Sequence, residues 1–141
     1  MRILHTADLH LGKTVNEFSM LEDQKFLLQQ LLDVTAEKKV DAVVISGDIY
    51  DRSVPPEDAV SLLDGFLTAL SKRGIPVLLV SGNHDSAERL SYGSKLFAKS
   101  GIHIAGAFTG TMPCVTLTDA FGPVNFYLLP FVKASVVRYY H

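Results

Sequence analysis

The stretch Ser81-Gly82-Asn83-His84-Asp85-Ser86 follows directly on the apolar run Pro76-Val77-Leu78-Leu79-Val80. A short apolar run bounded by turn residues is typical of a buried β-strand. The turn after it needs only the glycine and the asparagine, yet an imidazole and a carboxylate come next. Amide, imidazole and carboxylate groups in consecutive positions are suited to metal chemistry. The stretch therefore predicts a strand that ends in a functional loop.

Two earlier stretches have the same pattern. Ile3-Leu4-His5-Thr6-Ala7 runs into Asp8-Leu9-His10, and Val43-Val44-Ile45-Ser46 runs into Gly47-Asp48-Ile49-Tyr50-Asp51. Segments with helical periodicity separate the three predicted strands, which span residues 2–7, 40–46 and 77–81. A strand-helix-strand order predicts an α/β fold with a parallel sheet, in which the carboxyl ends of the strands meet at one edge.

The helices have recognisable starts and ends. The first is expected to begin at Ser19, which has capping-box spacing with Glu22, and to end near Lys38. The second is expected to begin after Pro55-Pro56 and to stop at Gly74. Its apolar positions cover more than one narrow stripe, so it is either a broadly buried helix or one whose surplus faces a second subunit.

The remaining chain contains four further predicted elements. These are a helix over residues 88–99 with a break near Tyr92-Gly93, a short strand at 102–105, a β-hairpin of 115–118 with 124–129, and a helix that includes His141.

Composition limits the functional classes. The 141 residues suit one domain, and 48% hydrophobic residues with a mean hydropathy of +0.22 fit strands covered on both faces. The formal net charge of −2 gives no basic field for nucleic acid, so a polyanion must be drawn in by metal ions or by a partner. Cys114 is the one cysteine; it excludes an internal disulfide, fits a reducing cytoplasm and is expected to be buried. No run approaches the roughly 20 apolar residues of a membrane span.

The polar residues of the three loops form a candidate two-metal site. Asp8 and His10 are two residues apart and can chelate one ion, Asp48 can bridge two ions, and Asn83 offers a carbonyl oxygen to the second. Oxygen and imidazole ligands without sulfur suit Mn²⁺, Fe²⁺ or Zn²⁺. Two such ions about 3.5–4 Å apart would generate hydroxide near neutral pH and clamp the oxygens of a phosphoryl displacement. The predicted reaction is hydrolysis of a phosphate ester.

His84 is better placed to protonate the leaving oxygen, or to stabilise negative charge, than to bind metal. Its second ring nitrogen needs a partner, and the Asp51 carboxylate is the candidate. Lys13, Arg52 and Arg89 flank the loops either as phosphate contacts or as solvated charges.

The motifs Asp8-Leu9-His10, Gly47-Asp48-Ile49-Tyr50-Asp51 and Gly82-Asn83-His84-Asp85 resemble the first three motifs of the calcineurin-like metallophosphoesterases. The fuller wording, from His5 to Gly12 and on to Ser86, is similar to the family's bacterial DNA-repair nucleases. The resemblance implies that Asp8 and His10 bind one metal ion, Asp48 bridges, Asn83 binds the other ion and His84 is catalytic. It also implies Mn²⁺-dependent cleavage of DNA, a homodimer and a partner ATPase of the SMC type.

The family pattern also needs a further histidine and a downstream Gly-His-x-His motif, and these 141 residues contain neither; His141 does not match them. The resemblance therefore implies that residues 1–141 are the N-terminal part of a four-layer α/β/β/α sandwich without its C-terminal part or any cap domain. Such a chain is expected to be weakly active or inactive alone. Two alternatives stay open: a metallophosphoesterase acting on phosphoproteins or nucleotides, and a catalytically silent dimerisation module.

Overall fold

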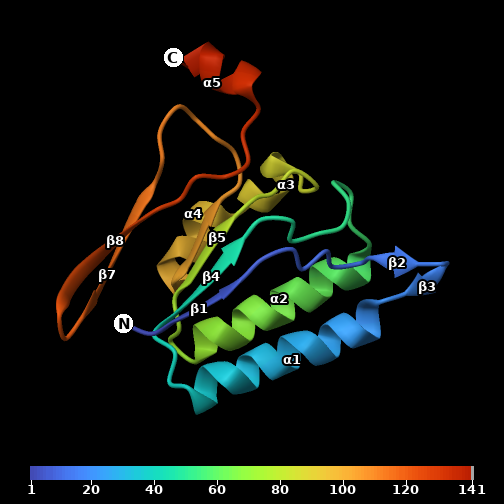
Figure 1. Cartoon of the computed structure of the whole chain (residues 1–141), viewed down its shortest axis with the longest axis horizontal. Coiled ribbons are helices and arrows are strands. Elements are labelled where there is room, and N and C mark those ends of the chain that lie inside the picture. Colours follow the sequence, from blue (N-terminus) through green and yellow to red (C-terminus); the bar gives the residue numbers. More distant parts are fainter. Residues whose placement is uncertain (141) are drawn as a thin grey trace.

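The computed structural model describes residues 1–140 and is built on a four-stranded parallel sheet (Figure 1). The strand order is β1-β4-β5-β6, so the neighbours pair in chain order. The strands are β1 (Ile3–Thr6), β4 (Ala42–Ser46), β5 (Val77–Val80) and β6 (Ile102–Ala105). The predicted strands and the α/β class are confirmed. All three pairings are parallel, which places the carboxyl ends of the strands at one edge.

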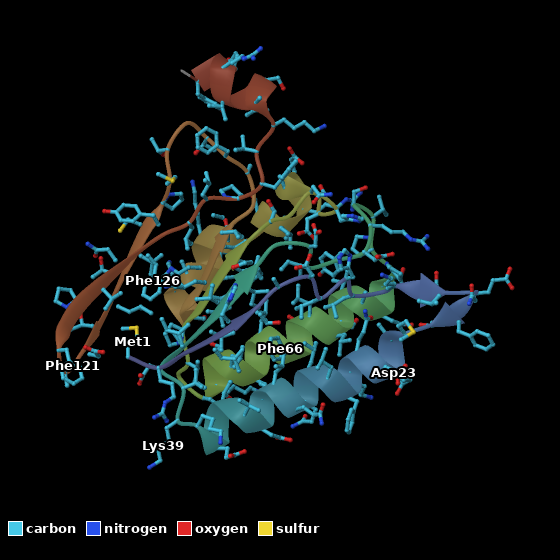
Figure 2. The ribbon with its side chains drawn as sticks, viewed as in Figure 1. Met1, Asp23, Lys39, Phe66, Phe121 and Phe126 are labelled. Atoms are coloured by element: carbon cyan, nitrogen blue, oxygen red, sulfur yellow. The ribbon has the colours of Figure 1, made fainter. Side chains whose placement is uncertain are left out.

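Helices α1 (Leu21–Glu37) and α2 (Glu57–Lys72) cover one face of the sheet (Figure 1). The main core lies between them and the sheet, because alternate strand residues point toward the helices. It includes Leu28, Leu32, Val43, Ile45, Leu63, Phe66, Leu70, Val77 and Leu79. Figure 2 shows Phe66 on α2. The predicted stop after α2 is confirmed by the left-handed backbone of Gly74 (φ 69°).

The segment before α1 differs from the prediction. It contains a small antiparallel hairpin, β2 (Thr14–Val15) with β3 (Phe18–Ser19), although no strand is predicted from the sequence between residues 7 and 19. Asn16 and Glu17 both have positive φ (49° and 67°), the conformation that a two-residue hairpin turn needs, but no glycine announces it. The capping box does not form: Met20 is the N-cap residue, and the Ser19 hydroxyl accepts from the Leu21 amide at 3.3 Å instead.

The predicted β-hairpin, β7 (Cys114–Asp119) with β8 (Gly122–Tyr127), packs over part of the other face of the sheet. Val115, Leu117 and Phe126 point toward Leu78 and Ala105 of the sheet. Cys114 alternates to the outer side and is exposed, so its predicted burial was wrong. At the hairpin tip, Phe121 is 96% exposed (Figure 2).

The Met1 ammonium group contacts the Asp119 carboxylate on β7. This hydrogen-bonded ion pair raises the pKa of the amine and lowers the pKa of the carboxyl. The contact ties the start of the chain to the hairpin (Figure 2).

Short helices complete the structure. α3 (Ala87–Ser91), α4 (Ser94–Phe97) and the 3₁₀ turn η1 (Ala98–Ser100) lead to β6, and Gly93 (φ 71°) makes the predicted break. α5 (Ala134–Tyr140) follows the hairpin, and His141 lies outside the described residues. Within residues 1–140, no helix is long and apolar enough to cross a membrane.

Candidate metal centre

Three loops meet at the carboxyl edge of the sheet: the first loop (residues 8–12), the second loop (47–51) and the third loop (82–86). The first two run side by side beyond their strands. Their main chains are joined by bonds from Asp8 N to Gly47 O (3.1 Å), His10 N to Asp48 O (2.9 Å), Leu11 N to Ile49 O (2.9 Å) and Asp51 N to Leu11 O (3.2 Å).

Three of the candidate ligands have a left-handed backbone. The φ angles are 54° for Asp8, 44° for His10 and 47° for Asp48. This conformation is uncommon for residues with a Cβ, and it persists only where the surrounding structure holds it. Its recurrence at three candidate ligands marks this edge as a functional one.

Asp8, His10 and Asp48 come together as predicted. His10 Nε2 lies 3.8 Å from Asp8 Oδ1 and 3.8 Å from Asp48 Oδ2. These separations are too long for hydrogen bonds but suit ligands that share an ion about 2.1 Å from each. The ligand atoms of all three lie within 4.8 Å of one another. Two carboxylates and one imidazole form a donor set that fits Mn²⁺, Fe²⁺ or Zn²⁺.

Asp48 has a second task. Its Oδ1 accepts from the His84 amide at 3.0 Å, while Oδ2 faces His10. The side chain is buried between the loops, and its residue is only 9% exposed. One carboxylate therefore both faces the metal cluster and joins the second loop to the third.

Asp51 is oriented differently from the expectation. Its main-chain carbonyl, not its carboxylate, lies 3.1 Å from His84 Nδ1, and its carboxylate Oδ1 lies 3.3 Å from His10 Nδ1. The bond from Asp51 N to Leu11 O turns this residue toward the first loop. His10 Nδ1 is buried, and no partner with hydrogen-bond geometry meets it among the described residues. His10, Asp51 and His84 thus form a second group able to hold an ion.

The two site histidines touch, with ring centroids 5.0 Å apart in an edge-to-face arrangement. His84 and Asn83 are both exposed. Asn83 also lines a hollow of about 470 Å³, whose opposite wall includes Phe131 and Lys133. The bond from Phe131 N to Ser81 O (2.9 Å) holds that wall beside the third loop. Of the candidate site residues only Asn83 lines this hollow; Asp8, His10, Asp48 and His84 do not.

Sequence reasoning counted the Asp85 carboxylate among groups suited to metal chemistry but missed its structural role. Its carboxylate accepts from three main-chain amides: Gly82 N at 2.8 Å, Ile49 N at 3.1 Å and Tyr50 N at 2.9 Å. Burial, followed by the negative charges of Asp85 and Asp64, raises the pKa of Tyr50 to about 12. The only signal in the sequence is the position of Asp85 inside the Gly-Asn-His-Asp motif.

Gly82 is required by close packing. A Cβ at this position would lie 2.1 Å from Asp48 Oδ1 and 2.2 Å from Asp48 N, well inside contact distance. The absence of a side chain lets the third loop approach the second.

Gln24 is a second residue that sequence reasoning missed. Its carboxamide on α1 donates to Leu9 O (3.2 Å) and His10 O (2.7 Å) and accepts from Gly12 N (3.0 Å). Nothing in the local sequence marks it, because it is one of several polar residues on an amphipathic helix.

The other candidates from the sequence lie apart from the cluster. Lys13, Arg52 and Arg89 are exposed, and none forms an ion pair within the described chain. His5 Nε2 lies 2.9 Å from Ser46 Oγ on the neighbouring strand, which gives this histidine a structural partner.

Two comparisons with known proteins identify the family of this chain. A family model described as calcineurin-like phosphoesterase matches residues 1–133. The chain is 40% identical over 141 residues to SbcD of the nuclease SbcCD from Staphylococcus saprophyticus, a match that covers 99% of this chain and 36% of that protein. The chain thus spans little more than a third of this relative's length. The matched residues include all three loops, and the chain belongs to the calcineurin-like phosphoesterase family.

Proposed function

We propose that this chain is the metal-binding N-terminal part of a DNA nuclease that hydrolyses phosphodiester bonds at DNA ends, by exonucleolytic and endonucleolytic cleavage. The observation that carries the proposal is the convergence of Asp8, His10 and Asp48 within 4.8 Å. The similarity to a component of a nuclease along 99% of the chain supports DNA as the substrate. The remaining ligands and any cap domain would come from the part of the nuclease that corresponds to the rest of the relative's length.

In this proposal Asp8, His10 and Asp48 hold one Mn²⁺ ion, and Asp48 with Asn83 holds a second. Such a pair of ions supplies a nucleophile at neutral pH and neutralises charge on the phosphate. The Asp51 carboxylate lies on the Nδ1 side of the His10 ring, 3.3 Å from that nitrogen, so Nε2 is the ring nitrogen that faces the cluster. Main-chain bonds from Asp8 N to Gly47 O and from His10 N to Asp48 O would hold the backbones of the three ligands together before metal binds, although the Asp8 side chain itself is 71% exposed.

His84 and Asp51 are the proposed catalytic residues. The Asp51 carbonyl can only accept a hydrogen bond, so His84 Nδ1 carries a proton when the two are paired. Nε2 is then the ring atom that delivers a proton to the leaving oxygen in the cationic form. The exposure of His84 leaves it open to a substrate phosphate at the edge.

We further propose three properties of the complete protein. The first is a partner ATPase of the SMC type, similar to SbcC, which would supply the DNA affinity that a net charge of −2 does not. The second is a homodimer, supported by an open apolar groove beside α2 that includes Val60, Tyr92 and Phe97. The third is a cytoplasmic location, which an exposed free Cys114 favours because reducing compartments preserve thiols.

The test compares two substrates under a Mn²⁺ titration: end-labelled duplex DNA and a small chromogenic phosphomonoester. We expect duplex cleavage by the chain extended to the full length of its relative, with little or none by residues 1–141 alone. Cleavage of the monoester alone would favour a small-substrate phosphoesterase. No cleavage by either chain, despite Mn²⁺ binding, would favour a silent dimerisation module, which the groove beside α2 also suits.

A further inference from the structure

The carboxamide of Gln24 lies against the first loop, although α1 carries it from the helical layer. Nε2 donates to His10 O at 2.7 Å and to Leu9 O at 3.2 Å, and Oε1 accepts from Gly12 N at 3.0 Å. Both donors and the acceptor of this half-buried side chain are therefore used on one loop. A helix side chain that places all of these hydrogen bonds within four consecutive loop residues fixes their conformation.

The first loop needs such support. Asp8, His10 and Gly12 have positive φ angles of 54°, 44° and 85°, so left-handed residues alternate along it. The amides of His10 and Leu11 bond to the second loop. The carbonyls of Leu9 and His10 accept instead from Gln24 on α1. The two sets of bonds tie the first loop to the second loop and to α1.

Other side chains cannot replace this one. A glutamate keeps the acceptor for Gly12 N but loses both donors, and its charge opposes the two carbonyl dipoles. A methionine has nearly the same length and good helix propensity but leaves Leu9 O and Gly12 N without a partner, while His10 O keeps only its bond from Lys13 N (3.1 Å). Only a primary amide can donate to the two loop carbonyls and also accept from the loop amide. The loop, and not the helical position on α1, therefore requires glutamine here.

We propose that Gln24 is a positioning residue of the metal centre. By locking residues 9–12 it holds the left-handed His10, and thereby sets the affinity of the Asp8, His10 and Asp48 cluster for its ion. The inference rests on the proposed function, because it assumes that this cluster binds Mn²⁺. Gln24 itself contacts neither the ion nor the substrate.

The experiment compares Gln24→Met and Gln24→Glu with Gln30→Met and Gln30→Glu on the whole chain. Gln30 is exposed on the same helix, so its variants make the same chemical changes away from the loop. Mn²⁺ affinity is measured by calorimetry, and hydrogen exchange of the His10 and Leu11 amides by NMR without metal, with the amides of β5 as internal reference. Gln24 bonds to neither measured amide directly.

Removing a residue that orients metal ligands weakens affinity by roughly 10- to 100-fold, and we expect this loss for both Gln24 variants. We also expect about tenfold faster exchange of the His10 and Leu11 amides relative to β5, with the Gln30 variants unchanged. Wild-type affinity with wild-type exchange in the Gln24 variants would overturn the inference, as would faster exchange spread equally over β5.

The Mn²⁺ affinity measurement (the metal arm) and the hydrogen-exchange measurement (the exchange arm) distinguish a failure of the proposed metal centre from a failure of the proposed role of Gln24. If the unaltered chain binds no Mn²⁺, the proposed metal centre of this chain fails. The exchange arm still decides the role of Gln24 in that case: selective loosening of the first loop supports positioning, and uniform or absent loosening overturns it. If Gln24→Met does not fold, Gln24→Glu, which keeps the bond to Gly12 N, provides the same comparison.

Discussion

The junction between the first and second loops differs from the junction between the second and third. The first junction consists of main-chain hydrogen bonds, which continue the pairing of β1 with β4 past the ends of the strands. The second depends on side chains: Asp48 accepts from the His84 amide, and Asp85 accepts from amides of both loops. A main-chain junction tolerates many residue types, whereas a junction made by two carboxylates depends on those carboxylates.

Asp48 of the second loop and Asp85 of the third loop make the side-chain junction together, but they do so in different ways. Asp48 faces the candidate ligand His10 with one carboxylate oxygen and accepts from the third loop with the other. Asp85 serves only the loops. Changes at these two positions should therefore separate metal binding from loop architecture.

The largest effect is expected from Asp48→Asn. The asparagine oxygen can still accept from the His84 amide, so the fold should persist, while the bridging charge is lost. Cleavage should fall by about 10³-fold, since the ions contribute several kcal/mol of charge stabilisation. Steady-state cleavage of duplex DNA by the chain extended to the full length of its relative checks the loss of activity, and thermal unfolding of the same chain checks that the fold persists. Asp64→Asn, an equal charge change at an exposed position on α2, is the control, and retained cleavage in Asp48→Asn would contradict the assignment.

Gly82→Ala should destabilise the junction between the second and third loops by a steric clash. The added Cβ meets Asp48 backbone and side chain at 2.2 and 2.1 Å, and overpacking of this kind costs about 1–3 kcal/mol. Urea unfolding measures the loss. The matched control is Gly65→Ala in α2, where nothing lies within 4 Å and where alanine should stabilise the helix by up to about 1 kcal/mol. Equal stabilities for the two variants would contradict the close approach of the loops.

Asp85→Asn tests the same junction chemically. One of its two carboxylate oxygens becomes an amide nitrogen, which cannot accept from the amides that face it, and an unpaired buried donor costs about 1–3 kcal/mol. Urea unfolding should show this loss, and Glu88→Gln should not, because Glu88 is exposed on the adjoining helix. Asp85 does not face the metal cluster, so any loss of Mn²⁺ affinity in a titration should be an indirect effect of the loosened third loop. A stability equal to wild type would mean that the three amides find other partners.

Tyr50→Phe should give the smallest effect, and only in alkali. An unfolded tyrosine loses its proton near pH 10, whereas the folded pKa is about 12. Between these values the folded state binds more protons than the unfolded state, so its stability falls as pH rises. The phenylalanine variant has no phenol to titrate. Its free energy of unfolding should therefore fall by on the order of 1 kcal/mol less than that of the wild type between pH 10 and pH 12. Urea unfolding at both pH values measures it, and identical losses would argue against burial as the main cause.

The sequence was sufficient for the sheet and for the gathering of Asp8, His10 and Asp48. Each apolar run is local, and parallel strands in chain order bring their carboxyl ends together whatever the details of packing. The orientation of Asp51 was not predictable, because it depends on a main-chain bond to Leu11 across the loops. Gln24 was invisible for the same reason: its partners lie 12 to 15 residues away in a loop whose shape no local pattern gives.

The structure differs from the sequence prediction at two further places, and both differences have local causes that propensity rules do not capture. The hairpin before α1 turns on Asn16 and Glu17 without a glycine, so its left-handed residues carry no usual signal. The exposure of Cys114 follows from the alternation of β7, in which Val115 and Leu117 occupy the inner side. Composition alone favours burial for cysteine, but strand position decides which side it takes.

The order of the sheet, β1-β4-β5-β6, is also the order of synthesis. Each new strand can be added to the free edge left by the one before it, and no strand has to be inserted between two that are already paired. Growth at one edge keeps the loop to be closed short at every step and lowers its entropic cost. The edge that carries the candidate metal ligands is then built in the same succession as the sheet itself, with the third loop docking last on the Asp48 side chain.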